Sequence, residues 1–279
     1  MTTANTHHTK HTGITPEAHQ TADEQTFSVL LQRAISEPGI VSAAYSRFHR
    51  FSLSNQMLAA LQLTQREMPL SPIASFTNWQ TLGRKVRKGE KALALYMPVS
   101  IKQREKNEET GEDVETGKLF TRFLLKRNWF SLTQTEGEDY AEPLVMPAWD
   151  ASNALEKLGI TEEPFAIVNG NVQGYASKRG IAVNPLAQFA HKTRFHELAH
   201  VVLGHTLEKG CWDTSSLPRH LQEAEAEGVA FILCSLLDLP GLEESRGYIQ
   251  SWLDGDQLPE KSARRIYSTA QTILEAGKA

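Results

Sequence analysis

The chain has 279 residues, which is enough for two modest domains. Its composition is 40% hydrophobic and 22% charged, as in ordinary globular proteins, and its net charge of −4 means that any basic surface must be local. No apolar run reaches the roughly 18 residues of a membrane span, and the polar first residues lack the apolar core of a signal peptide. We therefore expect a cytoplasmic protein without membrane partners, in which Cys211 and Cys234 are free thiols.

The N-terminal part of the sequence divides into a tail, a helical region and a β-rich region. Residues 1–24 have no hydrophobic pattern and are expected to form a disordered tail. Residues 26–67 carry apolar side chains at helical spacing and are expected to be mostly helical. In residues 73–133, the strand-like runs Ala92–Ile101 and Leu119–Leu132 flank a charged segment, which predicts a long β-hairpin with its tip between them.

A polar segment with two prolines, residues 137–147, predicts a linker. The chain is therefore expected to have an α+β fold in two domains, residues 25–140 and residues 148–279. Domains that are joined in this way usually have their own cores.

Basic residues are concentrated in one short segment of the first domain. Residues 82–91 contain five cations and one acid; the cations are Arg84, Lys85, Arg87, Lys88 and Lys91. Such cations can neutralise phosphates, and the nearby aromatic residues Phe51 and Trp79 could stack on bases. A short basic run is also typical of a solvated turn, and Phe or Trp is typical of a core, so both interpretations stay open.

Residues 196–200 read His-Glu-Leu-Ala-His, the pattern typical of zincins. His196 and His200 are one helical turn apart, so both imidazoles can reach the same metal ion. Glu197 follows the first histidine, where its carboxylate can take a proton from water. We therefore predict His196 and His200 as metal ligands and Glu197 as the catalytic base.

The sequence around this pattern favours a helix. Residues 180–185 predict a short strand ended by Asn-Pro, and residues 190–203 predict a helix with no proline or glycine. Gly204 then supplies a C-terminal stop. His205 has the wrong spacing for the third histidine of known zincin patterns, so we expect a loop or packing residue there.

A second helix is predicted over residues 221–231, and it supplies carboxylates. Glu223 and Glu227 share one face with two alanines, whose small side chains would let this helix approach the first one closely. We predict Glu223 as the third ligand and Glu227 as a carboxylate that orients a ligand histidine, while Glu225 points roughly the other way. A solvated acidic face, or Glu227 as the third ligand, are the alternatives.

Two imidazoles, one carboxylate and an open position suit a divalent metal, with zinc as the first choice and manganese or cobalt also compatible. Tyr248 or His220 is a weak candidate for stabilising an oxyanion. A structural metal site usually has four ligands, and this sequence offers three good ones, which favours a catalytic site.

The sequence resembles the ArdC-type antirestriction proteins of mobile genetic elements, in both halves and in the family's order. The resemblance covers about residues 26–275 and is carried by residues 51–58, 77–79, 82–91, 130–137, 174–176, 193–200 and 248–253. In one departure, Gln222 stands where the family has a glutamate, so the ligand assignment rests on Glu223 and Glu227.

The resemblance implies an N-terminal domain that binds single-stranded DNA and a C-terminal zincin-like metallopeptidase domain of the gluzincin type. It implies that incoming DNA is protected from host restriction during conjugation, and it adds Asn55 to the expected DNA contacts. Two functions are compatible with these features. One is a peptidase that acts on an unidentified protein substrate, and the other is a non-catalytic protein that shields single-stranded DNA and has a structural metal site.

Overall fold

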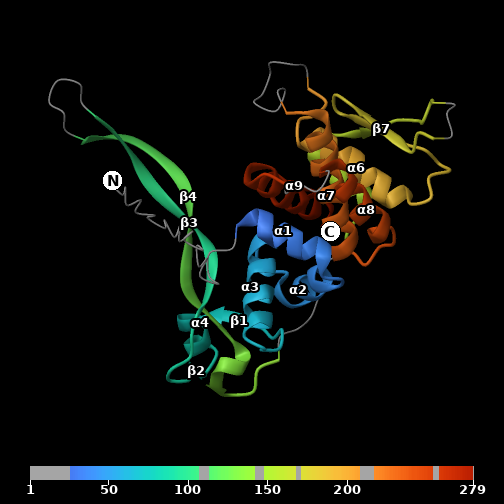
Figure 1. Ribbon diagram of the computed structural model, residues 1–279. Coiled ribbons are helices and arrows are strands. Elements are labelled where there is room, and N and C mark those ends of the chain that lie inside the picture. The colour runs from blue at the N-terminus through green and yellow to red at the C-terminus, as the bar shows by residue number, and fades with distance from the viewer. Residues whose placement is uncertain are drawn as a thin grey trace, which may run out of the picture.

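The computed structural model has a mixed helical and β-sheet fold (Figure 1). It describes residues 26–106, 113–141, 148–167, 171–207, 217–253 and 258–278. The tail expected at residues 1–24, most of the expected linker and Cys211 lie outside the described residues. The mixture of helix and sheet agrees with the fold class expected from the sequence.

Three helices open the described part of the chain: α1 (Phe27–Ser36), α2 (Ile40–Phe48) and α3 (Leu53–Gln65). The hydroxyl of Thr26 accepts a hydrogen bond from the backbone N–H of Val29 and caps the first helix. Gly39 has a φ of 78° between the first two helices, a left-handed conformation that glycine adopts without strain. Helices α1 and α2 each bury one apolar face, whereas α3 is buried on all sides from Gln56 to Leu63, including the polar residues Gln56 and Gln62.

The β-rich region forms two antiparallel sheets. The first has the order β1-β4-β3, and the second pairs β2 with β5. The elements are β1 (Ile73–Ser75), α4 (Phe76–Thr81), β2 (Arg84–Val86), β3 (Leu93–Lys106), β4 (Asp113–Ser131), the 3-10 helix η1 (Leu132–Gln134) and β5 (Thr135–Gly137).

Strands β3 and β4 form a twisted two-stranded arm that runs away from the helices (Figure 1). The ladder continues to the pair Lys106 and Asp113, so the strands are longer than the sequence predicts, and the centre of the expected tip lies outside the described residues. The sequence predicts a tip for this charged segment because it lacks apolar alternation. Backbone pairing does not require that alternation where no sheet face is covered by another layer.

Side chains of α3 cover the outer edge of β3. The amide of Asn55 donates to the carbonyl of Tyr96 at 2.9 Å and accepts from its N–H at 2.8 Å. Two turns further on, the buried amide of Gln62 makes the same pair of bonds with the backbone of Ala94, at 2.8 and 2.9 Å. These bonds satisfy backbone groups that an edge strand would otherwise leave open. They fix the arm to the helices at its base.

The C-terminal half combines helices with a three-stranded sheet of order β6-β8-β7. Its elements are α5 (Ala151–Leu158), β6 (Thr161–Glu162), β7 (Gly174–Ser177), β8 (Gly180–Val183), α6 (Ala190–Val202), α7 (Arg219–Leu236), α8 (Leu242–Leu253) and α9 (Glu260–Gly277). The predicted strand at residue 180 and the helix at residue 190 lie where the sequence places them, and α7 is longer than predicted. None of the helices in the described segments is long and apolar enough to cross a bilayer.

The buried apolar residues of both halves form one continuous cluster, from Leu30 on α1 to Leu274 on α9. Helix α9 packs against α1 and α3 as well as against α5, α6 and α7, and α7 also contacts α2. The expectation of separate cores is therefore corrected, because the helices of the first half bury their apolar faces on those of the second half. The domain boundaries themselves, at residues 25–140 and 148–279, stay a prediction.

Candidate metal centre

Helix α6 places its two histidines together. The Nε2 atoms of His196 and His200 lie 3.1 Å apart, one turn from each other along the helix. Phe195, Leu198 and Ala199 on the opposite side are buried, which fixes the rotation of the helix about its axis. The helix ends before Gly204, whose φ of 77° turns the chain out of the helical path.

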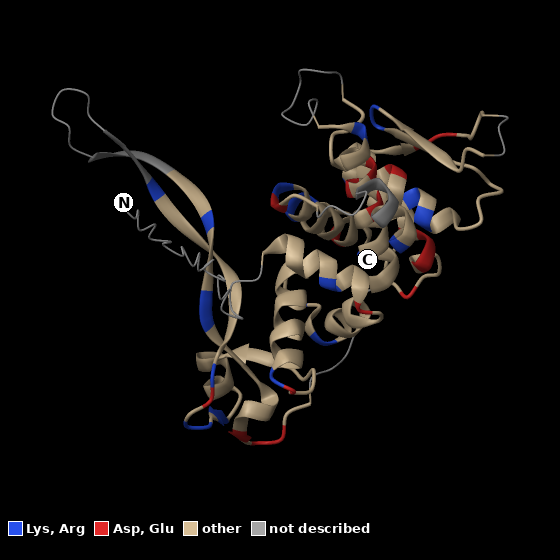
Figure 2. Cartoon of the chain, viewed as in Figure 1, with Lys and Arg blue, Asp and Glu red and all other residues tan. Residues whose placement is uncertain are grey.

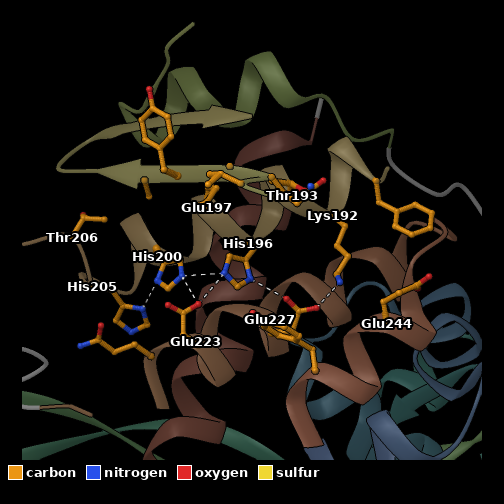
Figure 3. A pocket seen from close by; sticks show the side chains of 18 of the residues that line it. Lys192, Thr193, His196, Glu197, His200, His205, Thr206, Glu223, Glu227 and Glu244 are labelled. Atoms are coloured by element: carbon orange, nitrogen blue, oxygen red, sulfur yellow. Dashed lines mark hydrogen bonds and ion pairs between the residues drawn. The ribbon is translucent and has the colours of Figure 1, made fainter. Parts of the chain in front are cut away.

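Helix α7 brings Glu223 to the same place. Its Oε2 lies 3.4 Å from Nε2 of His196 and 3.5 Å from Nε2 of His200 (Figure 3). Tetrahedral coordination with bonds of roughly 2.0–2.1 Å holds ligand atoms about 3.3–3.4 Å apart. The separations therefore fit a divalent cation bound by two imidazoles and one carboxylate. Among the described residues these are the three metal-ligating side chains that cluster in this way.

Small residues let the two helices approach. Ala226 and Ala230 of α7 are fully buried, as expected for residues at a close helix–helix contact. On another side of α7, a Cβ added to Gly228 would come within 2.8 Å of Ile266 on α9. Helix α7 is thus held between α6 and α9 by side chains that leave little space.

Glu227 supports His196 from behind the cluster. Its Oε2 accepts a hydrogen bond from Nδ1 of His196 at 2.9 Å, and its Oε1 forms an ion pair with Nζ of Lys192 at 2.8 Å. Burial raises the pKa of this carboxyl group, but the neighbouring imidazole and ammonium groups outweigh burial and hold it at about 2. Glu227 thus lies where a carboxylate can orient a ligand histidine, and that role stays a prediction.

The electrostatics of the cluster favour charged carboxylates. Burial opposes a charge on His196, yet the carboxylates of Glu223 and Glu227 raise the pKa of this histidine to about 9. Hydrogen bonds from both histidines hold the pKa of Glu223 far below its usual range. A cation at this position would therefore meet a negatively charged ligand set.

Glu197 lies beside the cluster and is only 8% exposed. Burial raises the pKa of this carboxyl group against the lowering effect of the two histidines, which moves it toward the range of a general base. Strand β7 lies against it at Gly174, where an added Cβ would come 3.1 Å from Cγ of Glu197 and 2.6 Å from Cγ2 of Thr193. The glycine permits this close approach of strand and helix.

A cavity of about 1160 Å³ opens on the three candidate ligands and Glu197. Strand β7 lines it on one side and the helices α6 and α7 on the other, and Tyr248 of α8 lies at its border. Its volume is that of a site for a peptide segment or a small molecule. Tyr248 is 46% exposed, and its role as an oxyanion stabiliser is untested.

The structure also joins two residues that the sequence analysis set aside. His205, expected to be a loop or packing residue, has its Nδ1 3.0 Å from Nδ1 of His200 and its Nε2 3.0 Å from Oε2 of Glu225. Glu225 is fully buried and forms an ion pair with Arg265 of α9. It does point away from Glu223, but into the protein and toward His205. The signal that could have revealed it is that Glu225 lies between two alanines, on the side of the helix away from Glu223.

The predicted DNA contacts divide into buried and exposed residues. Trp79 is 1% exposed and donates its indole N–H to the carbonyl of Phe130, so its ring has no free face for a base. Asn55 is occupied by the backbone of β3, and Phe51 is half-buried against the core. These three side chains therefore stabilise the fold in this structure.

The basic cluster also divides. Arg84 donates to the hydroxyl and the carbonyl of Thr135, and Arg87 donates to the carbonyl of Thr135 and to Glu90, so both tie β2 to the chain around β5. Lys85, Lys88 and Lys91 are exposed. Arg87 is itself 45% exposed, so the three lysines and part of the Arg87 side chain face solvent.

Comparison with solved structures shows what the fold is similar to. The metal-free structure of the antirestriction protein ArdC from the R388 plasmid has a TM-score of 0.52 and 22% identity, covering 90% of this chain and 94% of that one. The Mn(II)-bound structure has a TM-score of 0.53 and 20% identity, covering 91% of this chain and 98% of that one. Residues 31–130 match the family model for the N-terminal domain of the anti-restriction factor ArdC.

Residues 31–130 thus form an ArdC-type N-terminal domain, and the fold of the chain is similar to that of ArdC. The resemblance inferred from its motifs is confirmed by these matches in the N-terminal domain and in the overall fold. An uncharacterised protein of Bacillus anthracis is 24% identical in an alignment that covers 79% of this chain. The chain spans about 45% of the length of that relative.

Proposed function

We propose that this ArdC-type protein is an antirestriction protein of a mobile element that acts in the cytoplasm. It binds single-stranded DNA through its N-terminal region and carries a zincin-like metal site, of gluzincin type, in its C-terminal region. The observation that supports the second part most strongly is the cluster of His196, His200 and Glu223 beside the buried Glu197. The similarity to ArdC supports the protective role of the whole protein.

The proposed ligands are His196, His200 and Glu223, and the proposed cation is divalent. Zinc suits two imidazoles and a carboxylate, while the Mn(II) in the related R388 protein makes manganese a second candidate. A bound cation would supply Lewis-acid polarisation of a substrate carbonyl and of water.

The residues of this chain would then handle the proton. Glu197 accepts a proton from the attacking water and passes it to the leaving amine, which fits a buried carboxyl group with a raised pKa. Glu227 holds His196 in the tautomer whose Nε2 is free for the metal. The reaction class is therefore peptide hydrolysis, on a protein substrate that reaches the cavity beside β7.

The alternative is a structural metal in a protein that only shields DNA. A structural site usually has four protein ligands and no open position. Here three candidate ligands face a cavity of about 1160 Å³, which favours access by a substrate. The proposal therefore keeps hydrolysis as the function of the metal site.

The DNA-binding surface is proposed on the arm and the basic cluster. Phe120 and Phe123 are 48% and 62% exposed on β4, and Arg122 lies between them. Cations follow the described part of the arm, and acidic side chains are absent there between residues 119 and 131 (Figure 2). Exposed aromatic rings beside cations are the combination that stacks bases and neutralises phosphates. Lys85, Lys88 and Lys91 extend the positive surface below the arm.

The proposal is tested by comparing Glu197→Gln protein with wild type. We expect unchanged metal content and unchanged affinity for single-stranded DNA, together with loss of any peptide cleavage, because only the proton acceptor is removed. Protection of incoming DNA from restriction is measured alongside. Loss of protection supports proteolysis as the mechanism, whereas full protection by Glu197→Gln protein supports shielding.

A further inference from the structure

A chain of buried polar groups leads from His200 to the other side of helix α7. Nδ1 of His200 lies 3.0 Å from Nδ1 of His205, and Nε2 of His205 lies 3.0 Å from Oε2 of Glu225. Nη1 of Arg265 then lies 3.0 Å from the same Oε2 atom, and Nη2 of Arg265 donates to the carbonyl of Leu203 at 2.7 Å. The side chain of His205 is 2% exposed and that of Glu225 is fully buried.

The chemistry of these groups fixes the direction of each hydrogen bond. An ionised Glu225 can only accept, so Nε2–H of His205 donates to it. A neutral His205 then has a lone pair on Nδ1, which accepts from Nδ1–H of His200. With its proton on Nδ1, the ring of His200 turns an unprotonated Nε2 toward His196 and Glu223, where the cluster needs a ligand atom.

We propose that His205 and Glu225 are positioning residues that hold His200 in the tautomer and orientation that bind the metal. This inference rests on the proposed metal site. It gives each ligand histidine its own support ending in a cation: His196 is supported by Glu227 and Lys192, and His200 by His205, Glu225 and Arg265. His200 has a second imidazole in the place where His196 has a carboxylate.

Packing alone does not account for the second support. Burying a carboxylate costs free energy, and an apolar side chain of similar volume is often neutral or more stabilising. Glu225 faces this cost in a stretch of α7 where its neighbours Ala224 and Ala226 are fully buried. What the carboxylate supplies and an apolar group cannot is an acceptor that fixes the proton positions of two successive imidazoles.

Arg265 has a structural part in the same arrangement. Its bond to the carbonyl of Leu203 holds the end of α6, where the chain turns at Gly204 before reaching His205. The backbone N–H of His205 in turn donates to the carbonyl of His200 at 2.9 Å. The turn therefore returns His205 onto the ligand five residues before it.

The test measures Zn(II) affinity by chelator competition in four folded variants. His205→Phe keeps a planar aromatic ring, though a larger one, and removes both hydrogen bonds, and we expect affinity to fall by about 10- to 100-fold. His205→Gln can still accept and donate, so it should recover part of the loss. Glu225→Gln keeps the shape but weakens the acceptor, with an expected loss of about tenfold. The matched control is His49→Phe, an equivalent change at a partly buried histidine of the first region, which should leave affinity unchanged.

A spectroscopic measurement accompanies the affinities. With Co(II) as the probe, His205→Phe should shift the visible absorption bands, because the orientation of one ligand changes, whereas His49→Phe should not. The proposal is overturned if folded His205→Phe protein binds Zn(II) within twofold of wild type, or if His205→Gln loses as much as His205→Phe. If His205→Phe protein does not fold, the Zn(II) affinity of Glu225→Gln protein decides: a loss of about tenfold supports the proposal, and an affinity within twofold of wild type overturns it. Failure of wild type to bind Zn(II) or Co(II) would instead remove the metal site itself.

Discussion

The metal centre and the arm present their charged groups in opposite ways. Around α6 and α7, carboxylates and imidazoles are buried and paired with one another, so each position depends on several partners. On the arm, cations lie on an exposed ribbon beside exposed aromatic rings (Figure 2). A buried network holds its geometry before a ligand arrives, whereas an exposed cationic surface attracts a polyanion and responds to salt. The buried arrangement is suited to metal binding and catalysis, and the exposed arrangement is suited to binding a flexible single strand of DNA.

The largest expected effect is at the metal centre. The His196→Ala/His200→Ala protein should lose its divalent metal entirely, because one carboxylate remains of the three ligands, while its affinity for single-stranded DNA stays unchanged. Metal content after dialysis and DNA binding are the measurements. His191→Ala, on the same helix but outside the cluster, is the control that should keep the metal. Full metal occupancy in the double variant would show that His196 and His200 are not the metal ligands.

The next effect separates buried from exposed aromatic residues. Trp79→Ala should lower the free energy of unfolding by about 3–5 kcal/mol, because the ring is buried and its N–H is hydrogen-bonded. Phe123→Ala on the arm should change it by less than about 0.5 kcal/mol. Denaturant unfolding of both variants measures the difference. Equal stability losses would contradict the division between a core ring and a surface ring.

The exposed rings should matter for DNA. Phe120→Ala/Phe123→Ala protein should bind single-stranded DNA at least about 30-fold more weakly, since each stacked base contributes about 1–3 kcal/mol and two rings are removed. Its metal content should not change. Leu186→Ala removes an exposed apolar side chain beside the metal region and is the matched control. Unaltered DNA affinity in the double variant would exclude the arm as the stacking surface.

The reactivity of Cys234 tests whether the N-terminal and C-terminal halves of the chain unfold together. Burial raises the pKa of its thiol to about 12, so at pH 8.5 the native thiol is protonated and alkylation requires opening of the core. In the native protein the raised pKa keeps the thiol protonated, and so unreactive, below about pH 12. In the unfolded protein the thiol has an ordinary pKa and is alkylated fast. In a Cys211→Ser background, Phe48→Ala should speed alkylation of Cys234 at least about tenfold, because Phe48 of α2 and Cys234 of α7 belong to one apolar core. An unchanged rate in a destabilised variant would mean that the regions open independently.

The smallest effect concerns the basic cluster. Lys85→Ala/Lys88→Ala protein should bind single-stranded DNA only a few-fold more weakly at moderate salt, and its salt dependence should be shallower by about 1.4 in logarithmic slope. Arg84→Ala should instead reduce stability, because this side chain holds β2 against the chain at Thr135. DNA titrations at several salt concentrations and thermal unfolding distinguish the two. If the Lys85→Ala/Lys88→Ala protein were also less stable than wild type, these lysines would contribute to the stability of the fold as well.

The sequence predicted most about the metal centre because helical spacing is local. The i,i+4 spacing brings His196 and His200 together, and the small residues on the face of α7 that carries Glu223 predict the close approach of the two helices. The second support of His200 was missed, because His205 follows a glycine turn whose direction depends on Arg265, sixty residues later in the chain. That contact is tertiary and leaves no local pattern.

The arm was predicted in outline but its function was assigned to other residues. Hydrophobicity places Trp79 and Phe123 in the same class, and only the pairing of β4 with β1 and the packing of α4 decide which ring is buried. The role of Asn55 could not be predicted for the same reason, because a polar residue on a helix can bond the backbone at a strand edge as well as a ligand. Edge pairing between distant segments is what the sequence alone does not specify.

The most direct test of the account is the position of a bound metal. Crystals grown with Zn(II) or Mn(II) would be measured at the absorption edge of the metal, and the anomalous difference map would show where the cation lies. We expect a single peak bounded by Nε2 of His196, Nε2 of His200 and the carboxylate of Glu223, with Glu227 still bonded to Nδ1 of His196. A peak coordinated by Glu227 in place of Glu223, or one away from the two histidines, would contradict the proposed site.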